Sequence, residues 1–400
     1  MTDERTAPAT ALMLGFAERT GLSGGLPPRR YLWTDAFAVC NFLALERATG
    51  DARYRELALR LVDQVHHTLG RHRADDARQG WISGLGEHEG ETHPTRGGLR
   101  IGKELPERAP GEACDEELEW ERDGQYFHYL TRWMHALDQL SRATGDARFN
   151  RWARELAASA HGAFIAPPSA RGPHRMYWKM SIDLARVLVP SMGQHDALDG
   201  YITVLQLCAT ARRLPQPAGG PDLREALRDF GAIAARGDWA SADPLGIGGL
   251  LADAGRVAEL TQERAVDDEG LLERLLAAAR AGLDCYAGSG QLRDSAQHRL
   301  AFRELGLAIG LHAVTLIARE HAPARPAARA EVDALLRHVP LGDDIESFWC
   351  NTAHRAGDTW RAHRDINEVM LATRLLPAGF LLLPPPPGCR IRASSARDRS

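Results

Sequence analysis

The chain has 400 residues, enough to bury a hydrophobic core without disulfides or metal ions. Hydrophobic residues make up 44% and charged residues 26% of the chain, which is the composition of a globular protein rather than a disordered one. The net charge of -4, from 49 basic and 53 acidic residues, argues against a dedicated nucleic-acid-binding protein.

The sequence contains no run of 18 or more apolar residues, so no membrane-spanning helix is expected. Its most apolar tract, 371–383, is interrupted by Arg374, Pro377 and Gly379. The first ten residues carry charges of both signs and lack the apolar core of a secretion signal. The six cysteines stand singly, with no C-x-x-C pair, as reduced thiols do. We therefore expect a cytoplasmic protein without a membrane partner or a closed zinc site.

Helix-forming residues dominate, and one helical pattern occurs twice. Residues 46–54, ERATGDARY, return as 141–149, SRATGDARF. In each copy the glycine suits a left-handed helix C-cap, and the aspartate after it suits an N-cap of the next helix. The pattern predicts a helix hairpin with a very short connection, whose two arms must be antiparallel neighbours.

This hairpin serves as a template for the whole chain. First-arm helices are expected at 33–48, 120–144, 196–213, 245–264, 298–320 and 365–376. Second-arm helices are expected at 51–70, 146–164, 223–236, 271–286 and 327–338. The sixth first arm has no partner after it, and the N-terminal segment 8–20 is the candidate for the twelfth helix.

Six inner and six outer helices predict an all-α fold, an (α/α)6 toroid formed by one domain over residues 1–383. Residues 72–119 form a long insertion, as active-site lids often do. Residues 384–400, which begin with four prolines, are expected to be a disordered tail. An open α-solenoid is the alternative architecture.

In such a ring the N-termini of all inner helices gather at one mouth. Asp35 and Asp123 begin neighbouring inner helices, whose axes should lie about 8–10 Å apart. Their carboxyl groups would then have the spacing of an inverting glycosidase pair, about 6.5–9.5 Å. They are the predicted catalytic acid and base. Helix capping is the alternative role for each.

Aromatic rings beside carboxylates and planar donors suit a sugar, and such residues accompany the inner helix starts. The predicted substrate-binding residues are Trp33, Tyr126, Phe127, Trp178, His195, Asp196, Arg303, Trp360, His363, Arg364 and Asp365. On the second inner helix, the face with Asp123, Tyr126, Phe127, Leu130 and Met134 is expected to line the bore. His128 and His135 lie on other faces and are expected to be structural.

Other short patterns give no cofactor. Residues 87–93, EHEGETH, match no closed zinc pattern and are expected to form a solvated acidic loop without a helix. Gly246, Gly248 and Gly249 follow no strand, so they are interpreted as allowing close helix packing. No nucleophile elbow, phosphate-binding loop or dinucleotide fingerprint occurs. Neither a metal ion nor an organic cofactor is predicted.

Through its hairpins and its aromatic and acidic inner helix starts, the chain resembles the six-hairpin glycosidase-like superfamily over nearly its whole length. The stretch Tyr31-Leu32-Trp33-Thr34-Asp35 looks like the Trp-x-Asp stretch of the unsaturated uronyl hydrolases, although Ala36 stands where they have a second aspartate. The chain is also similar in length to the N-acylglucosamine 2-epimerase group. That resemblance implies two bases on opposite faces of a sugar, for which His195 and His363 are the candidates.

The sequence therefore predicts a glycoside hydrolase that acts on a short or modified oligosaccharide through Asp35 and Asp123. A sugar 2-epimerase or isomerase that uses His195 and His363 is the alternative within the same fold. A non-catalytic helical scaffold or binding protein is the alternative of another class. The expected partner is a small carbohydrate, and the oligomeric state is left open.

Overall fold

The computed structural model describes residues 2–166, 175–215, 219–268 and 270–387. Within these residues, six helices form an inner ring, each in contact with the next. They are α2 (Leu32–Thr49), α6 (Phe127–Thr144), α8 (Asp196–Arg213), α10 (Pro244–Gln262), α12 (Ala301–Glu320) and α16 (Arg364–Leu375). Because α16 also contacts α2, the ring is closed, and the fold is an (α/α)6 toroid rather than an open solenoid.

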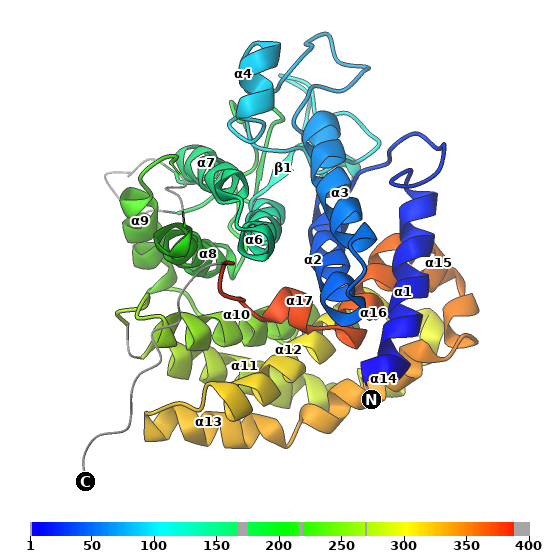
Figure 1. The fold of residues 1–400 in the computed structure, drawn as a ribbon, viewed down its shortest axis with the longest axis vertical. Helices are drawn as coiled ribbons and strands as arrows, with labels where there is room; N and C mark the ends of the chain where they lie inside the picture. The colour runs from blue at the N-terminus through cyan, green and yellow to red at the C-terminus, as the bar shows by residue number, and fades with distance from the viewer. Residues whose placement is uncertain (1, 167–174, 216–218, 269, 388–400) are drawn as a thin grey trace.

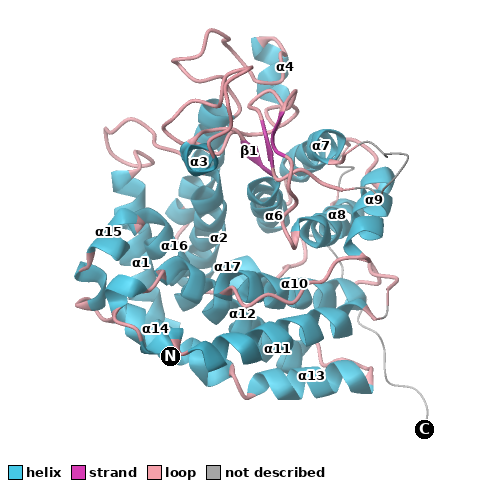
Figure 2. Cartoon of the chain, turned by 180° about the vertical axis from the view of Figure 1, so that it is seen from behind, coloured by secondary structure: helices cyan, strands magenta, loops and turns pink. Residues whose placement is uncertain are grey.

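The outer layer is formed by helices that each pack against an inner partner (Figure 1; Figure 2). They are α3 (Arg53–Leu69), α7 (Ala147–Phe164), α9 (Arg224–Ala234), α11 (Leu271–Ser289), α13 (Pro326–Leu336) and α1 (Thr2–Arg19). The N-terminal helix α1 packs on α16 and α2, so it completes the twelve, as the sequence indicated. Another helix, α14 (Val339–Cys350), had no counterpart in the sequence analysis and packs on α12 and α16.

Burial separates the two layers. In α2 all residues from Leu32 to Leu45 are buried, because neighbouring helices surround this helix. In α3 the buried residues form a single stripe that includes Tyr54, Ala58, Leu61 and Val65, at the spacing of one helix face. Inner helices thus bury polar side chains as well as apolar ones, and these polar side chains build the site.

The repeated hairpin has the caps that the sequence predicted. Gly50 and Gly145 adopt left-handed conformations, with φ of 71° and 74°, and close α2 and α6. The carboxylate of Asp146 accepts a hydrogen bond from the backbone N–H of Arg148, and Asp51 accepts one from Arg53. Each connection therefore satisfies backbone groups of both helices within a few residues.

The second inner helix begins at Phe127, seven residues later than the sequence indicated. Before it, α5 (Glu116–Glu121) is a separate short helix, and β1 (Gln125–Tyr126) pairs with β2 (Lys179–Met180). A third strand, β3 (Val187–Val189), completes the antiparallel order β1-β2-β3. The break comes from a long-range contact: the buried ammonium of Lys179 donates to the carbonyls of Glu119 and Arg122.

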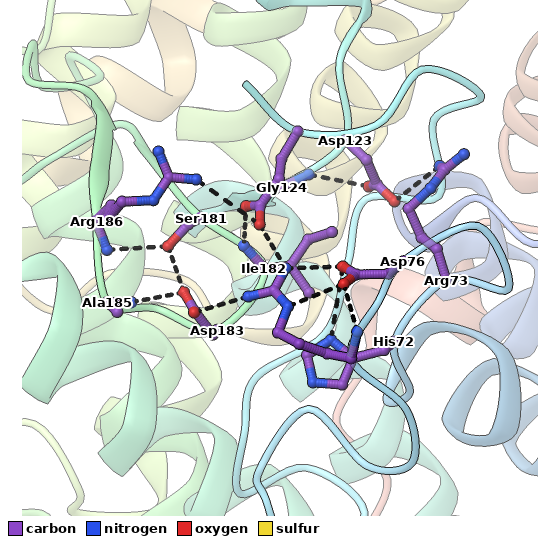
Figure 3. A network of polar contacts seen from close by, with 12 residues as sticks. His72, Arg73, Asp76, Asp123, Gly124, Ser181, Ile182, Asp183, Ala185 and Arg186 are labelled. Carbon is purple, nitrogen blue, oxygen red and sulfur yellow. Dashed lines mark hydrogen bonds and ion pairs between the residues drawn. The ribbon is translucent and has the colours of Figure 1, made fainter. Parts of the chain in front are cut away.

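The insertion 72–119 is tied to the β2–β3 hairpin by an ion network (Figure 3). Arg78 pairs with Asp76, Glu107 and Asp183, and Glu107 also accepts a hydrogen bond from the N–H of Ile182. Contrary to expectation, residues 87–92 form a short helix, α4 (Glu87–Thr92). No group of three or more potential metal ligands comes together anywhere in the described ranges.

After α16 the chain turns inward rather than away from the ring. The short helix α17 (Ala378–Leu381) contacts α2, α6 and α10, and Figure 1 shows it between α10 and α2. The described part of the expected tail, 384–387, is anchored, since Arg142 donates to the carbonyl of Pro384. Residues 388–400 lie outside the described residues. The remaining helical segments are α15 (Asp358–Ala362) and three 3-10 turns, Gln291–Arg293, Ala296–His298 and His354–Ala356.

One helix in the described part of the chain, α12, is long and apolar enough to cross a membrane. In the structure 67% of that apolar stretch is buried, and the helix lies in the inner ring. This is the environment of a core helix, and it accounts for the apolar composition.

Helices α10 and α12 touch through glycines, which leads to a prediction. A Cβ built on Gly310 would lie 2.5 Å from the carbonyl oxygen of Gly248. Gly310→Ala is therefore expected to destabilise the fold by about 1–3 kcal/mol through overpacking. Gly249→Ala is the matched control, since its Cβ would meet only Arg132 at 3.8 Å. Urea denaturation of both variants tests this, and equal midpoints would contradict the close contact.

Candidate functional site

The inner ring encloses a cavity of about 400 Å³. Residues from the first turn of five inner helices line it: Trp33 of α2, His128 of α6, Asp196 of α8, Leu245 of α10 and Arg303 of α12. The N-termini of these five inner helices therefore gather at one cavity, whereas α16 contributes Met370 from further along the helix. Its further polar lining comprises Arg132, Gln194, His195, Asp199, Ser241, Asp243 and Asp253.

Aromatic rings form one wall and the floor of the cavity. Trp178, which directly precedes β2, packs edge-on against Trp120 at 5.1 Å between ring centroids. On the floor, Phe37 lies between Trp33 and Phe380, with 4.4 Å between the centroids in each pair. Flat apolar surfaces of this kind suit the C–H faces of a sugar ring, and the pocket volume is within the range of about 300–1,000 Å³ usual for small-molecule sites.

Two histidines contribute to the cavity lining. The Nε2 of His195 lies 2.7 Å from the carbonyl oxygen of Trp239, an acceptor, so Nε2 carries a proton. In the neutral ring the lone pair is then on Nδ1, for which the described residues provide no partner. His195 thus has a fixed tautomer with a basic nitrogen left for a ligand.

The imidazole ring of the second histidine, His128, has no hydrogen-bond partner among the described residues. Burial lowers its pKa to about 4, the charge of Arg132 adds to this effect, and the charge of Asp199 opposes it. The imidazole is therefore neutral near pH 7. The nearby rings of Tyr129 and Trp178, at 4.8 and 6.3 Å between centroids, restrict its orientation.

A buried ion network forms another part of the lining. Asp199 accepts hydrogen bonds from Arg256 at 2.7 Å, from Arg132 at 3.3 Å and from the hydroxyl of Thr131. Arg256 also donates to Asp253 at 2.5 Å. Burial alone would raise the pKa of Asp199, but the two arginines outweigh it and lower that pKa to about 2. For Asp253 burial dominates and raises the pKa.

The arginines that line the cavity are already paired. Arg132 contacts Asp199, and Arg303 forms an ion pair of 2.5 Å with Asp243. Asp196 differs, because its hydrogen bond comes from the backbone N–H of Gly193, at 3.2 Å. Burial raises its pKa to about 7, the charge of Asp199 raises it further, and the Gly193 N–H opposes the shift. The lining therefore offers a carboxyl group that can be protonated near neutrality, and its arginines are occupied by carboxylates.

The structure places Asp35, one of the two predicted catalytic residues, outside the cavity lining. Its carboxylate accepts a hydrogen bond from the backbone N–H of Tyr31 at 2.9 Å and pairs with the buried Arg30 at 3.3 Å. These are the contacts of an acid in the first turn of a helix. Burial still raises the pKa of Asp35, to about 6, against the effect of Arg30.

Asp123, the other predicted catalytic residue, is also outside the lining, and it is fully buried. It pairs with Arg100 at 2.5 Å and with Arg73 at 3.5 Å, and it accepts from the N–H groups of Gly102 and Gly124. Figure 3 shows its contacts with Arg73 and Gly124. Three of these donors, Arg73, Arg100 and Gly102, belong to the insertion, so Asp123 holds the insertion against the ring. The structure thus does not bring Asp35 and Asp123 together in the cavity.

Of the predicted substrate-binding residues, Trp33, Trp178, His195, Asp196 and Arg303 line the cavity. The other six do not, and each has another partner. The ring of Tyr126 lies tilted against those of Trp120 and His128. Phe127 packs on Phe164 and Phe230. Trp360 stacks on Trp349. His363 precedes α16 and meets Phe302, Arg364 pairs with Glu368, and Asp365 pairs with Arg19.

Arg132 and Asp253 line the cavity but were not among the residues predicted from the sequence, and His128 was predicted to be structural. The face of α6 that was expected to line the bore, with Phe127, Leu130 and Met134, packs against other helices instead. His128 and Arg132 lie on the face of α6 that lines the cavity. The available signal was spacing: charged side chains three or four residues apart, such as Asp253 and Arg256, inside an otherwise apolar helix. Buried charges require partners, and such pairs mark where inner helices carry polar side chains.

Comparisons with known proteins give no family. No protein-family model matches the chain, and no curated protein matches it. Among solved structures, it is similar to cellobiose 2-epimerase from Spirochaeta thermophila, with a TM-score of 0.45 and 12% sequence identity over 86% of each chain.

The raised pKa of Asp196 predicts a pH-dependent stability. Between its ordinary value of 3.8 and about 7, the folded protein retains a proton that the unfolded chain has lost. The contribution of Asp196 to stability is therefore fully present below about pH 4 and is lost as the pH rises to 7 and above, by up to roughly 1.4 kcal/mol per pKa unit. Asp196→Asn removes this dependence and retains an acceptor for Gly193.

We expect the stability of Asp196→Asn relative to the wild type to increase between about pH 5 and pH 8. Urea denaturation at both pH values measures this, and Asp222→Asn, at an exposed site, is the control. A difference that does not change with pH would contradict the assignment.

Proposed function

We propose that the protein is a carbohydrate-active enzyme that moves a proton on a sugar carbon, as a 2-epimerase or isomerase does. The observation that supports this is that His128 and His195 line the same aromatic-walled cavity, each with a ring nitrogen left for a ligand. The proposal keeps His195 from the two-histidine hypothesis and replaces His363, which lies outside the lining, by His128.

The proposed chemistry begins with an open-chain sugar whose C1 carbonyl makes the C2 proton acidic. His128, neutral because of its lowered pKa, removes that proton, and the electron pair moves into an enediolate whose oxygen carries the negative charge. Asp196 also lies in the lining, and because burial raises its pKa to about 7, its protonated carboxyl group can donate a hydrogen bond to this oxygen. His195 returns a proton to C2 through Nδ1 from the side of α8. The reaction is redox-neutral, and water restores the protons of the two histidines.

The charges of the lining favour a sugar without an anionic group. Arg132 and Arg303 are each already paired with an aspartate, so a uronate would have to compete with Asp199 or Asp243. Asp196, whose hydrogen bond comes from a backbone N–H rather than from an arginine, adds no positive charge to the lining. This supports a neutral sugar and disfavours the uronate substrate implied by the resemblance to unsaturated uronyl hydrolases.

A glycoside hydrolase is the second candidate, with Asp196 in the place of the predicted acid. Its pKa of about 7 keeps a fraction of the carboxyl protonated at neutral pH, as a general acid requires. Asp253, also in the lining, would activate water. Under this alternative the glycosidic bond is cleaved and C2 keeps its hydrogen.

One experiment distinguishes these proposals. The protein is incubated in deuterated water with glucose, mannose, N-acetylglucosamine or cellobiose, and products are followed by NMR and mass spectrometry. Deuterium at C2 without bond cleavage is the expected result. Cleavage without exchange would favour the hydrolase, and neither reaction, together with no thermal stabilisation by any of these sugars, would favour the non-catalytic scaffold.

A further inference from the structure

The bore of the ring is filled beyond the cavity by the chain's own C-terminal segment, residues 378–384. Phe380 of α17 lies in the cavity floor, where it stacks on Phe37. A Cβ built on Gly379 would lie 2.3 Å from the carbonyl oxygen of Cys40, so the segment lies directly against α2. The segment is therefore part of the wall of the site.

Three side chains on one face of α6 hold this segment. His135 Nε2 lies 2.9 Å from the carbonyl oxygen of Phe380, and Gln139 donates to the carbonyls of Gly379 and Leu382. Arg142 donates to the carbonyls of Leu383 and Pro384. The spacing 135, 139 and 142 repeats about once per helical turn, so the three donors form a ladder along α6. On the opposite side, Glu259 of α10 accepts from the N–H of Leu383 at 2.8 Å.

This part of the bore is closed to solvent. His135, Gln139 and Arg142 are at most 1% exposed, although all three are polar. Buried polar groups are stable when they are hydrogen-bonded, and here the carbonyls of the C-terminal segment provide acceptors. The segment thus fills the bore with backbone that the ring specifically binds, rather than with loosely packed side chains.

We propose that the segment 378–384 is an internal stopper that makes the site a blind pocket, and that Phe380 sets the depth of that pocket. A pocket of about 400 Å³ with one opening accepts the end of a sugar chain, one or two units, and excludes the interior of a polymer. This statement of substrate class rests on the proposed function. The stopper itself does not, and the two are tested separately.

The stopper is tested by labelling thiols without any sugar. Phe380→Cys and Leu381→Cys are each treated with iodoacetamide, and the modified positions are read by peptide mass spectrometry. Phe380 is in the cavity lining, whereas Leu381, also buried, is not. We expect labelling at position 380 and at least tenfold slower labelling at 381. The native buried Cys40 is an internal reference within each variant.

Equal labelling of both positions would show a bore open from the far end, and no labelling at 380 would show a cavity that does not reach Phe380; either result overturns the stopper.

If the variants do not fold, the wild-type protein provides a second test of the blind pocket. Calorimetric titration with glucose, cellobiose and cellohexaose should show no gain in affinity beyond the second unit, and a steady gain up to cellohexaose overturns the blind pocket. If no sugar binds, the proposed function fails, while the labelling result stands.

Discussion

His195→Gln is expected to lower the rate of C2 deuterium exchange by about 10²–10⁴-fold, the usual contribution of a general acid or base. Gln can still donate to the carbonyl of Trp239, which His195 contacts at 2.7 Å, so the melting temperature should remain close to that of the wild type. What the variant lacks is the imidazole Nδ1 that is left for a ligand. The exchange rate, measured by NMR with the sugar that reacts with the wild type, gives the result.

The matched control is His67→Gln, at an exposed histidine that contacts Glu91 outside the cavity. This control should exchange at the wild-type rate. An exchange rate within threefold of the wild type in His195→Gln would remove His195 from the proposed mechanism. A parallel loss of rate and melting temperature would instead assign His195 a structural role at the start of α8.

Asp138→Ala is expected to destabilise the protein by about 3–5 kcal/mol, the usual cost of removing one partner of a buried ion pair. Asp138 is fully buried and accepts hydrogen bonds from Arg142, Asn150, Gln206 and Thr210, at 2.8–3.2 Å. The substitution leaves the buried guanidinium of Arg142 without its closest carboxylate. Because Arg142 also holds the C-terminal segment, the ladder on α6 should weaken as well.

Urea denaturation measures this effect, with Asp146→Ala as the control. Asp146 caps α7 at the surface, so its loss should cost only about 1 kcal/mol. A double variant, Asp138→Ala with Arg142→Leu, should recover part of the loss, because it removes the unpaired charge. If Asp138→Ala and Asp146→Ala are equally destabilising, the buried network does not stabilise the fold as proposed.

Most of the helices could be predicted because their signals are local. The predicted range 196–213 matches α8 at both ends, and the predicted ends of α2, α10 and α16 lie within two residues of the observed ends. The start of α6 was wrong because it depends on pairing between β1 and β2, more than fifty residues apart. Likewise, α4 was missed because six residues give too little periodicity to recognise.

Whether Asp35 and Asp123 are catalytic could not be judged from the sequence, because capping and catalysis place aspartates at the same helix positions. For Asp123 the deciding contacts come from Arg73 and Arg100, which belong to the insertion and carry no recognisable spacing. For His128 the deciding fact is which side of α6 faces the bore. In α6 the apolar side packs against other helices and the polar side, with His128 and Arg132, faces the cavity, whereas a polar helix side ordinarily indicates solvent.

The sequence by itself determined most of the helices and the hairpin connections, since periodicity and capping act over a few residues, whereas the contact between α16 and α2 decided that the ring is closed. It also indicated that the inner helix starts would meet, because the topology of hairpins requires it. The tertiary structure alone decided which side chains share the cavity, which acids are neutralised by distant arginines, and that residues 378–384 fill the bore. These depend on contacts between residues tens to hundreds of positions apart, where burial and charge pairing, rather than local preference, set the outcome.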